Sequence, residues 1–214
     1  MKEDFSFTSA QKMYFPIKRA LDLIVAFFAI VPLLFLYLFV KLTYLFQKDN
    51  NPVIYKQTRI GKNGKEFEIY KFRTMNPDAE QELKSLLKNS DNRNEWEEYH
   101  KLKNDPRITP FGLFLRKSSL DEFPQFINVL KGEMSVIGPR PLVEGELQLH
   151  HGLPLYEKLR PGITGWWACN GRSVLAYSER LEYEYYYVRN VSFKLDLTIF
   201  FKTIISIIGA VGAQ

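Results

Sequence analysis

Cysteine and histidine are scarce in this sequence of 214 residues. The one cysteine, Cys169, cannot form a disulfide within the chain, which fits a reducing compartment and a small buried apolar role for its side chain. Two of the three histidines are adjacent, at His150 and His151, and no other ligand clusters with them. Because zinc sites use three or four protein ligands, we expect this pair on the surface. The sequence therefore excludes a disulfide scaffold and gives no support to a zinc enzyme.

Long basic runs and recognised nucleic-acid motifs are also lacking. The formal net charge of +5 arises from 29 Lys and Arg against 24 Asp and Glu. Such a balance suits nucleic acid, an anionic membrane surface or a nucleotide substrate, and charge alone does not choose between them. A nucleic-acid binder is a rival interpretation that only charge and aromatic content suggest, and we expect no nucleic acid as partner. With 46% hydrophobic residues, the chain can bury one sizeable core.

The sequence does contain one continuous apolar run, from Leu23 to Val40, interrupted only by Pro32. The run has about the minimum length for a straight membrane span, since a hydrocarbon core of about 30 Å takes roughly 20 helical residues. It is too long and begins too late for an ordinary signal peptide, and no small-residue cleavage site follows it. We therefore expect a membrane-embedded segment here.

The residues around this run predict how it enters the membrane. Lys18 and Arg19 precede it and Lys41 follows it, and positive residues mark the cytoplasmic side of a membrane. Pro32, near the middle, removes one helical hydrogen bond and predicts a bend. We predict a re-entrant helix–break–helix hairpin with both ends in the cytoplasm. A bent single-pass anchor is the alternative.

A β-hairpin is predicted after the apolar run. Val53–Tyr55 and Phe67–Phe72 have the β-branched and aromatic content of short strands, and Asn63 with the glycine that follows it is a strong turn signal. Lys71 and Arg73 alternate with aromatic residues, so both cations would point the same way from a strand. A solvated face is the simplest interpretation of these two cations.

Three further segments are predicted from their composition. Asn76–Asn104 is polar and helical in pattern, which is typical of a solvated surface. Two adjacent tryptophans, Trp166 and Trp167, suit either a membrane interface or core packing. Leu195–Ile208 is apolar but includes charged residues, which favours a helix that lies in the membrane plane or docks on the hairpin over one that spans.

The stretch from Leu115 to Pro141 combines charged residues, prolines and a short predicted helix. Two adjacent carboxylates, Asp121 and Glu122, stand just before a short helix predicted to begin near Pro124 and to end at Gly132. Unpaired backbone N–H groups and the helix dipole favour an anion at such a helix N-terminus. The acids are thus close to one source of fixed positive charge.

Arg116 precedes these acids, and Arg140 follows the helix in the stiff turn Gly138–Pro141. A carboxylate pair between sources of positive charge suits phosphate and a divalent metal. A structural alternative stands beside this one, because Ser119 to Glu122 fits the S-x-x-E capping box, in which the acids would only cap a helix. Against it, Pro124 would then occupy the fifth helical position, where it cannot donate a hydrogen bond.

This stretch also carries a family resemblance. The sequence RKSSLDEFPQFINVLKGEMSVIGPRP resembles the signature of the bacterial sugar transferase family, the monotopic polyprenyl-phosphate sugar-1-phosphate transferases. The resemblance extends to YKFRTM at Tyr70–Met75 and RPGITG at Arg160–Gly165, and it covers nearly the whole chain. It implies a mixed α/β, mainly helical fold with small strands. An N-terminal tail and membrane hairpin (1–48) would precede a cytoplasmic catalytic domain (49–214) that ends in an interfacial helix.

The resemblance implies a chemistry as well. Family members transfer a sugar 1-phosphate from a UDP-sugar to a polyprenyl phosphate such as undecaprenyl phosphate and release UMP, the first membrane step of a surface-polysaccharide pathway. Carried onto this sequence, Asp121 would be a nucleophile that forms a covalent acyl phosphate. Asp121 and Glu122 would hold Mg²⁺. The phosphates would be contacted by Lys71, Arg116, Arg140 and Arg172.

Donor and location follow from the same resemblance. The insertion at 76–104 resembles the branch that transfers hexose 1-phosphates such as galactose or glucose 1-phosphate. Two departures weaken finer inference, because Val31-Pro32 replaces the common Ser-Pro and Ala168 replaces a glutamine. The implied location is the cytoplasmic face of the bacterial inner membrane, with self-association left open. The alternative is a membrane-anchored adaptor that binds anionic lipid without catalysis.

Overall fold

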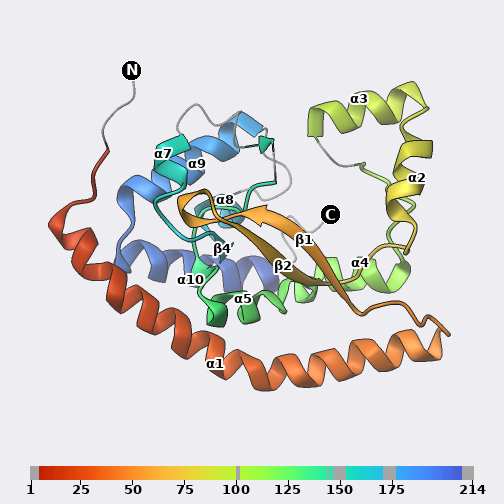
Figure 1. Ribbon diagram of the computed structural model, residues 1–214, viewed down its shortest axis with the longest axis horizontal. Coiled ribbons are helices and arrows are strands. Elements are labelled where there is room, and N and C mark those ends of the chain that lie inside the picture. Colours follow the sequence, from red (N-terminus) through yellow and green to blue (C-terminus); the bar gives the residue numbers. More distant parts are fainter. Residues whose placement is uncertain (1–4, 100–101, 144, 147–152, 171–176, 209–214) are drawn as a thin grey trace.

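The computed structural model describes residues 5–99, 102–143, 145–146, 153–170 and 177–208 (Figure 1). The helices in these ranges are α1 (Ser9–Phe46), α2 (Ala79–Leu86), α3 (Ser90–Tyr99), α4 (Pro110–Lys117), α5 (Gln125–Lys131), α7 (Leu153–Tyr156), α8 (Trp166–Cys169), α9 (Tyr177–Asn190) and α10 (Phe193–Ile208). The strands are β1 (Ile54–Ile60), β2 (Glu66–Phe72), β3 (Ser135–Ile137) and β4 (Gly162–Thr164), and the short 3₁₀ turns are η1 (Lys62–Gly64) and η2 (Leu120–Glu122). The prediction of a mainly helical fold with small strands is confirmed.

α1 is one helix that continues through Pro32. It begins with a capping box, in which Thr8 Oγ1 accepts a hydrogen bond from Gln11 N and the Gln11 side chain accepts one from Thr8 N. Figure 1 shows it bending along the lower edge of the molecule without folding back on itself. The structure therefore has a bend where two separate helices were predicted. Pro32 removes one backbone hydrogen bond, but the leucines after it favour helix and carry the turn onward.

Much of α1 faces away from the rest of the protein. Of its most apolar 18-residue window, only 22% is buried, so α1 is not an ordinary core helix, and its length and composition are sufficient for a membrane span. Ala26, Leu33 and Val40 are buried at helical spacing and form one stripe against the domain. The exposed surface carries large apolar side chains, among them Phe28 and Phe35.

Two buried carboxylates fasten α1 to the domain. Asp22 accepts hydrogen bonds from Ser135 Oγ (2.8 Å) and from the next backbone N–H of β3 (2.9 Å). Asp196 of α10 accepts a hydrogen bond from the Tyr14 hydroxyl (2.7 Å) and pairs with Lys18 Nζ (2.8 Å). A buried carboxylate is tolerated where such partners replace water. These bonds fix the first turns of α1 against β3 and α10.

β1 and β2 form the predicted antiparallel hairpin, with Ile54 opposite Phe72. Its turn holds Asn63 at φ 59° and Gly64 at φ 68°, the left-handed region that Asn and Gly tolerate. The buried residue Ile69 of β2 packs in one cluster with α1 and α5. The hairpin is therefore seated on the same helices that precede and follow it.

β3 and β4 pair in parallel, with Ser135 opposite Gly162. A Cβ on Gly162 would lie 2.1 Å from Gly138 N, so the two backbones approach closely only because glycine is present. This contact brings the segment after β3 beside the RPGITG motif, far along the sequence.

The remaining helices agree in part with the sequence predictions. α2 and α3 form the predicted helical insertion and project from the body at the upper right of Figure 1. α10 begins at Phe193, exposes Phe201 and docks on α1 through Asp196. Trp166 stacks on Tyr186 with ring centroids 5.6 Å apart, which supports the packing interpretation for this tryptophan.

α4 packs on the segment after β2 at Gly112, where an added Cβ would lie 1.9 Å from Thr74 O. We predict that Gly112→Ala destabilises the fold by about 1–3 kcal/mol, the usual cost of overpacking, and lowers the melting temperature in detergent. Leu113→Ala, at an exposed position on the same helix, is the matched control and should change the melting temperature little. An unchanged melting temperature for Gly112→Ala would contradict this packing.

Candidate active site

The two predicted acids lie in η2, between α4 and α5. Ser119, which precedes η2, has φ 57° and makes no side-chain capping bond, so the capping box considered as the structural alternative is not formed. α5 begins one residue after Pro124, and Gly132 at φ 84° ends it, as the sequence indicated. The acids therefore stand in a turn of their own, just before the helix.

Lys71 reaches the acid pair from β2. Its Nζ donates to Glu122 Oε1 at 2.7 Å, and the two side chains are 27% and 34% exposed. An ion pair this open contributes little to stability. Its importance lies in its position, because it holds a cation beside the carboxylates where a ligand can reach both.

Arg116 approaches the acids from the last turn of α4. Its Nε donates to Thr74 Oγ1 at 2.9 Å, which orients the guanidinium. Thr109 caps the start of the same helix, where its Oγ1 accepts from Gly112 N at 2.9 Å. Burial lowers the pKa of Arg116, while the negative charge of Asp121 opposes that shift. Arg116 and Asp121 are therefore close enough to interact electrostatically.

The charged form of Asp121 is unfavourable in the folded protein. Its pKa is raised to about 6, first by burial and then by the charge of Glu122, although Lys71 and Arg116 act in the opposite direction. Two adjacent carboxylates resist carrying charge together unless positive charge joins them. This arrangement suits a reactive carboxylate more than a structural one, which would be stabilised in its charged form.

The structure places Arg140 in a second charge cluster. Arg140 Nη1 lies 3.1 Å from Glu146 Oε2, and Arg180 Nη2 lies 3.4 Å from the other oxygen of that carboxylate. Glu184 is also buried here, and burial raises its pKa to about 8 even though Arg180 and Arg140 favour its charged form. Both clusters hold carboxylates that burial makes difficult to ionise.

The two clusters lie along one face of the hairpin. Tyr55 is the register partner of Lys71, and Tyr55, Gln57 and Arg59 share a face because side chains alternate along a strand. Arg59 Nη2 donates to Gln57 Oε1 at 2.6 Å, and Arg59 Nη1 donates to the carbonyl oxygen of Pro141 at 3.1 Å, beside Arg140. Arg59 lies four positions after Tyr55 along the strand, a distance of about 13 Å. The face therefore joins the acid pair to the Arg140 cluster.

Comparison with known proteins identifies the family. The sequence model of the bacterial sugar transferase family matches residues 13–210. The chain belongs to the bacterial sugar transferase family. An uncharacterized sugar transferase from Haemophilus influenzae is 45% identical over 92% of this chain and 42% of its own length.

Two further relatives of this family member have more specific names. The undecaprenyl-phosphate galactose phosphotransferase of Salmonella typhimurium is 43% identical over 87% of this chain and 39% of its own length. The exopolysaccharide production protein ExoY of Rhizobium meliloti is 44% identical over 87% of this chain and 83% of its own length. The chain thus spans about two fifths of the Haemophilus and Salmonella relatives and most of ExoY.

Other predicted residues of this family member lie elsewhere. Arg73 follows the end of β2 and pairs with Asp49 at 2.7 Å, where it also lies over the Tyr44 ring, so it is part of the packing around α1. Arg172 and the two adjacent histidines lie outside the described residues. Sequence reasoning did not single out Thr74, although it stands in the YKFRTM motif, nor Arg59, which the alternation along β1 could have indicated.

The acid pair fits a magnesium ion by its chemistry. Within the described ranges, no three His, Cys, Asp or Glu side chains gather closely enough to hold a metal alone. Mg²⁺ needs fewer protein ligands, since it is commonly bound by one or two carboxylates together with substrate phosphates and water. The pKa of Asp121 is raised by burial and then by the charge of Glu122, and a divalent cation beside both carboxylates would oppose that shift. Asp121 and Glu122 are therefore suitable ligands for Mg²⁺ in the presence of a phosphate substrate.

Asp121→Asn should stabilise the folded protein at neutral pH. In the unfolded chain this aspartate ionises at its ordinary pKa of 3.8, whereas folded Asp121 keeps its proton until about pH 6. Above that pH the folded state holds an unfavourable charge, which lowers its stability by up to about 3 kcal/mol for a shift of about two pKa units. The neutral amide avoids this cost, so the gain should be complete at pH 7 and small near pH 4.

Denaturant unfolding in detergent with EDTA, at both pH values, measures this difference. Asp91→Asn, at an exposed position on α3, is the control and should change stability little at either pH. A helix-capping carboxylate would behave in the opposite way, since its loss costs about 0.5–2 kcal/mol. A clear loss of stability for Asp121→Asn at pH 7 would therefore contradict the description of a desolvated acid.

Proposed function

We propose that this protein transfers a sugar 1-phosphate from a UDP-sugar to undecaprenyl phosphate and releases UMP. The observation that carries the proposal is the partly buried pair Asp121 and Glu122, with Lys71 bonded to one acid and Arg116 interacting with the other. Phosphoryl transfer between two anions depends on positioning and charge neutralisation more than on acid–base chemistry. The name of the Salmonella typhimurium relative describes a transfer of this kind.

Asp121 is the proposed nucleophile. One carboxylate oxygen attacks the phosphorus that carries the sugar, a bond forms between them, and the bond from that phosphorus to the bridging oxygen breaks as UMP leaves. An oxygen of undecaprenyl phosphate then attacks the same phosphorus and displaces the carboxylate. The products are UMP and a sugar diphosphate on undecaprenol, and Asp121 is restored. Because only the ionised carboxylate attacks, the first step requires a pH above its raised pKa.

The surrounding residues have separate roles in this proposal. Lys71 and Arg116 neutralise the transferred phosphate, and Thr74 orients Arg116 through its hydroxyl. Arg140, at the other end of the hairpin face, is assigned to the nucleotide part of the donor, which extends away from the reacting phosphorus. Arg172 keeps its predicted role as a phosphate contact. Galactose or glucose 1-phosphate is the favoured transferred group.

Asp121 and Glu122 would hold Mg²⁺ together with the donor phosphates. When bound, the ion supplies positive charge to the phosphate oxygens and to the carboxylates. Glu122 accepts a hydrogen bond from Lys71, so a metal held by this carboxylate would lie close to that cation.

The proposed location is the cytoplasmic face of the inner membrane. Large apolar side chains are exposed not only on α1 but also on α4, α5 and α10, including Phe114, Ile127 and Phe201. Large apolar side chains exposed on several helices are typical of a membrane-facing protein. We propose that α1 enters and leaves the membrane on the same side, bending near Pro32, so that the hexose phosphate is transferred at the lipid surface.

The activity is tested with purified protein, undecaprenyl phosphate, Mg²⁺ and a panel of UDP-sugars, following UMP release. Asp121→Asn should lower the rate by several orders of magnitude, as the loss of a covalent nucleophile does, and Arg116→Gln should lower it less. Asp91→Asn is the matched acid control and should remain active. Chelation of Mg²⁺ should abolish turnover of the active proteins.

Two results would contradict the proposal. One is turnover near the normal rate by a folded Asp121→Asn protein, which would return the acids to a structural role. The other is an absence of UMP release with every UDP-sugar in the panel, which would favour the adaptor that binds anionic lipid without catalysis.

Topology is tested by cysteine labelling in intact cells, in a Cys169→Ser background. Ser6→Cys lies before α1 and Lys65→Cys lies in the hairpin turn, and both positions are exposed. If α1 is re-entrant, both cysteines should react only after the inner membrane is opened. Pro32→Leu should shift α1 toward spanning, because it restores a straight helix near the minimum length. Periplasmic labelling of Ser6→Cys alone in the parent protein would show a single-pass anchor instead.

A further inference from the structure

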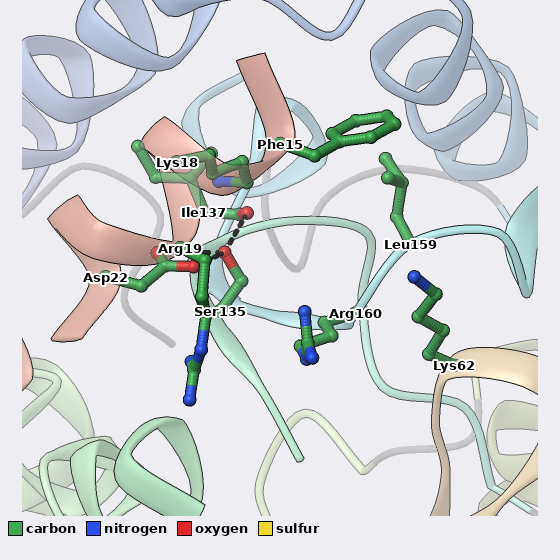
Figure 2. A pocket seen from close by; sticks show the side chains of 9 residues that line it. All are labelled: Phe15, Lys18, Arg19, Asp22, Lys62, Ser135, Ile137, Leu159 and Arg160. Carbon is green, nitrogen blue, oxygen red and sulfur yellow. Dashed lines mark hydrogen bonds between the residues drawn. The ribbon is translucent and has the colours of Figure 1, made fainter. Parts of the chain in front are cut away.

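A second site lies at the opposite end of α5 from the acid pair. Figure 2 shows the side chains that line a pocket between the first turns of α1, the strand β3 and the hairpin turn, among them Arg19, Lys62 and Arg160. Arg160 Nε donates to the carbonyl oxygen of Gly132, the residue that ends α5, at 2.7 Å. The acids precede the start of α5, and a helix of this length is about 10 Å long. The pocket is therefore distinct from the proposed catalytic site.

The carboxylates near this pocket are already committed. Asp22, which lines it, accepts from Ser135 Oγ and from a backbone N–H, as described above. Lys18 is neutralised by Asp196 on the far side. Glu133, which directly follows Gly132, pairs with Lys131 at 2.8 Å. None of these acids forms an ion pair with Arg19, Lys62 or Arg160, and Asp22 acts on Arg19 only through its charge.

Those three cations come from three separate elements and share one space. Among the described residues, no carboxylate lies within ion-pair distance of Arg19, Lys62 or Arg160. Arg19 Nη1 is buried and has no hydrogen-bond partner there. The pKa of Lys62 is lowered by burial and then by the charge of Arg160. A buried donor without a partner is unfavourable, and so is the repulsion between Lys62 and Arg160, and an anion in the pocket would relieve both.

We propose that Arg19, Lys62 and Arg160 form a phosphate-binding site separate from the acid pair. Guanidinium and ammonium groups converging on a small space are the usual protein ligands of phosphate, which accepts several charge-assisted hydrogen bonds. Arg19 lies four residues before the apolar run that begins at Leu23, at the level where lipid headgroups would meet the protein. The phosphate is therefore that of an anionic lipid headgroup or a free phosphate ion. Bound there, it would tie α1 to the hairpin and to the segment before β4.

The reactivity of Lys62 with an amine reagent reports on this site. An anion beside the ammonium raises its pKa, so less of the reactive neutral amine is present at a given pH and acylation slows. The full chain in maltoside micelles is labelled briefly at fixed pH, with inorganic phosphate or phosphatidylglycerol added, and sodium chloride keeps the ionic strength constant. Modification at Lys62 and Lys65 is quantified by peptide mass spectrometry. Lys65 is exposed on the same turn but does not line this pocket, so it is the internal control.

Saturable protection of Lys62 by at least about fivefold, with Lys65 unaffected, is expected. Protection by inorganic phosphate identifies a free anion as sufficient, whereas protection by phosphatidylglycerol alone identifies the lipid headgroup, and either result supports the site. Absence of protection by both ligands would overturn it.

Variants separate this site from the catalytic one. Arg160→Gln and Arg19→Gln should each raise the ligand concentration for half-protection by about tenfold, as expected for loss of one charge-assisted contact. Lys12→Gln, an exposed cation on the same helix, should leave protection unchanged. Asp121→Asn should also keep full protection, so loss of the proposed transferase activity would not affect this result. If one arginine variant fails to fold, the other serves as the test. Unchanged protection in every arginine variant that folds would overturn the proposal.

Discussion

The buried carboxylates of Asp22 and Asp196 hold the apolar helix α1 against the domain, and the rest of the site is placed from that attachment. Each acid is 5% exposed and is kept in the protein by hydrogen bonds from β3 or from α1 and α9. With α1 fixed, Ala26 packs with Ile69 of β2 and Val129 of α5 in one cluster. β2 then presents Lys71, and α5 fixes the end of the turn that carries the acids. A helix with an exposed apolar surface thus also serves as the base on which the polar site is built.

The electrostatics of the site differ from those of the attachment. Asp22 and Asp196 are each surrounded by hydrogen-bond donors, whereas Asp121 has its pKa raised by burial and by an adjacent carboxylate. A fold that was selected only for stability would avoid such a pair or neutralise it with closer cations. Lys71 and Arg116 compensate for it in part, which leaves room for the positive charge of a metal and for a phosphate held between them. Charged groups held in an environment that disfavours their charge are typical of sites that perform chemistry.

Local signals in the sequence predicted the elements that local chemistry determines. The Asn-Gly turn predicted the hairpin, and Pro124 and Gly132 predicted the bounds of α5. The two adjacent acids predicted a cluster of charged side chains just before that helix. The sequence could not show that α1 stays continuous at Pro32, because whether a proline bends or breaks a helix depends on the packing on either side of it. Nor could it show that Arg140 pairs with Glu146 and that Lys71 pairs with Glu122. Lys71 on β2 and Glu122 in η2 lie 51 residues apart, so only tertiary packing brings them together, and the pairing of Arg140 with Glu146 depends on the conformation of the segment after β3.

The central claim is that Asp121 carries the sugar phosphate on its own oxygen. The most direct measurement is mass spectrometry of the protein after incubation with Mg²⁺ and the UDP-sugar it turns over, without undecaprenyl phosphate, followed by rapid acid quenching and digestion. Without the lipid acceptor the second step, in which the sugar phosphate leaves Asp121, cannot occur, so the intermediate should accumulate. The account predicts an added mass of one sugar phosphate on the peptide that contains Asp121, and its loss when undecaprenyl phosphate is supplied. An active enzyme that releases UMP with no such adduct under these conditions, or with the adduct on another residue, would contradict it.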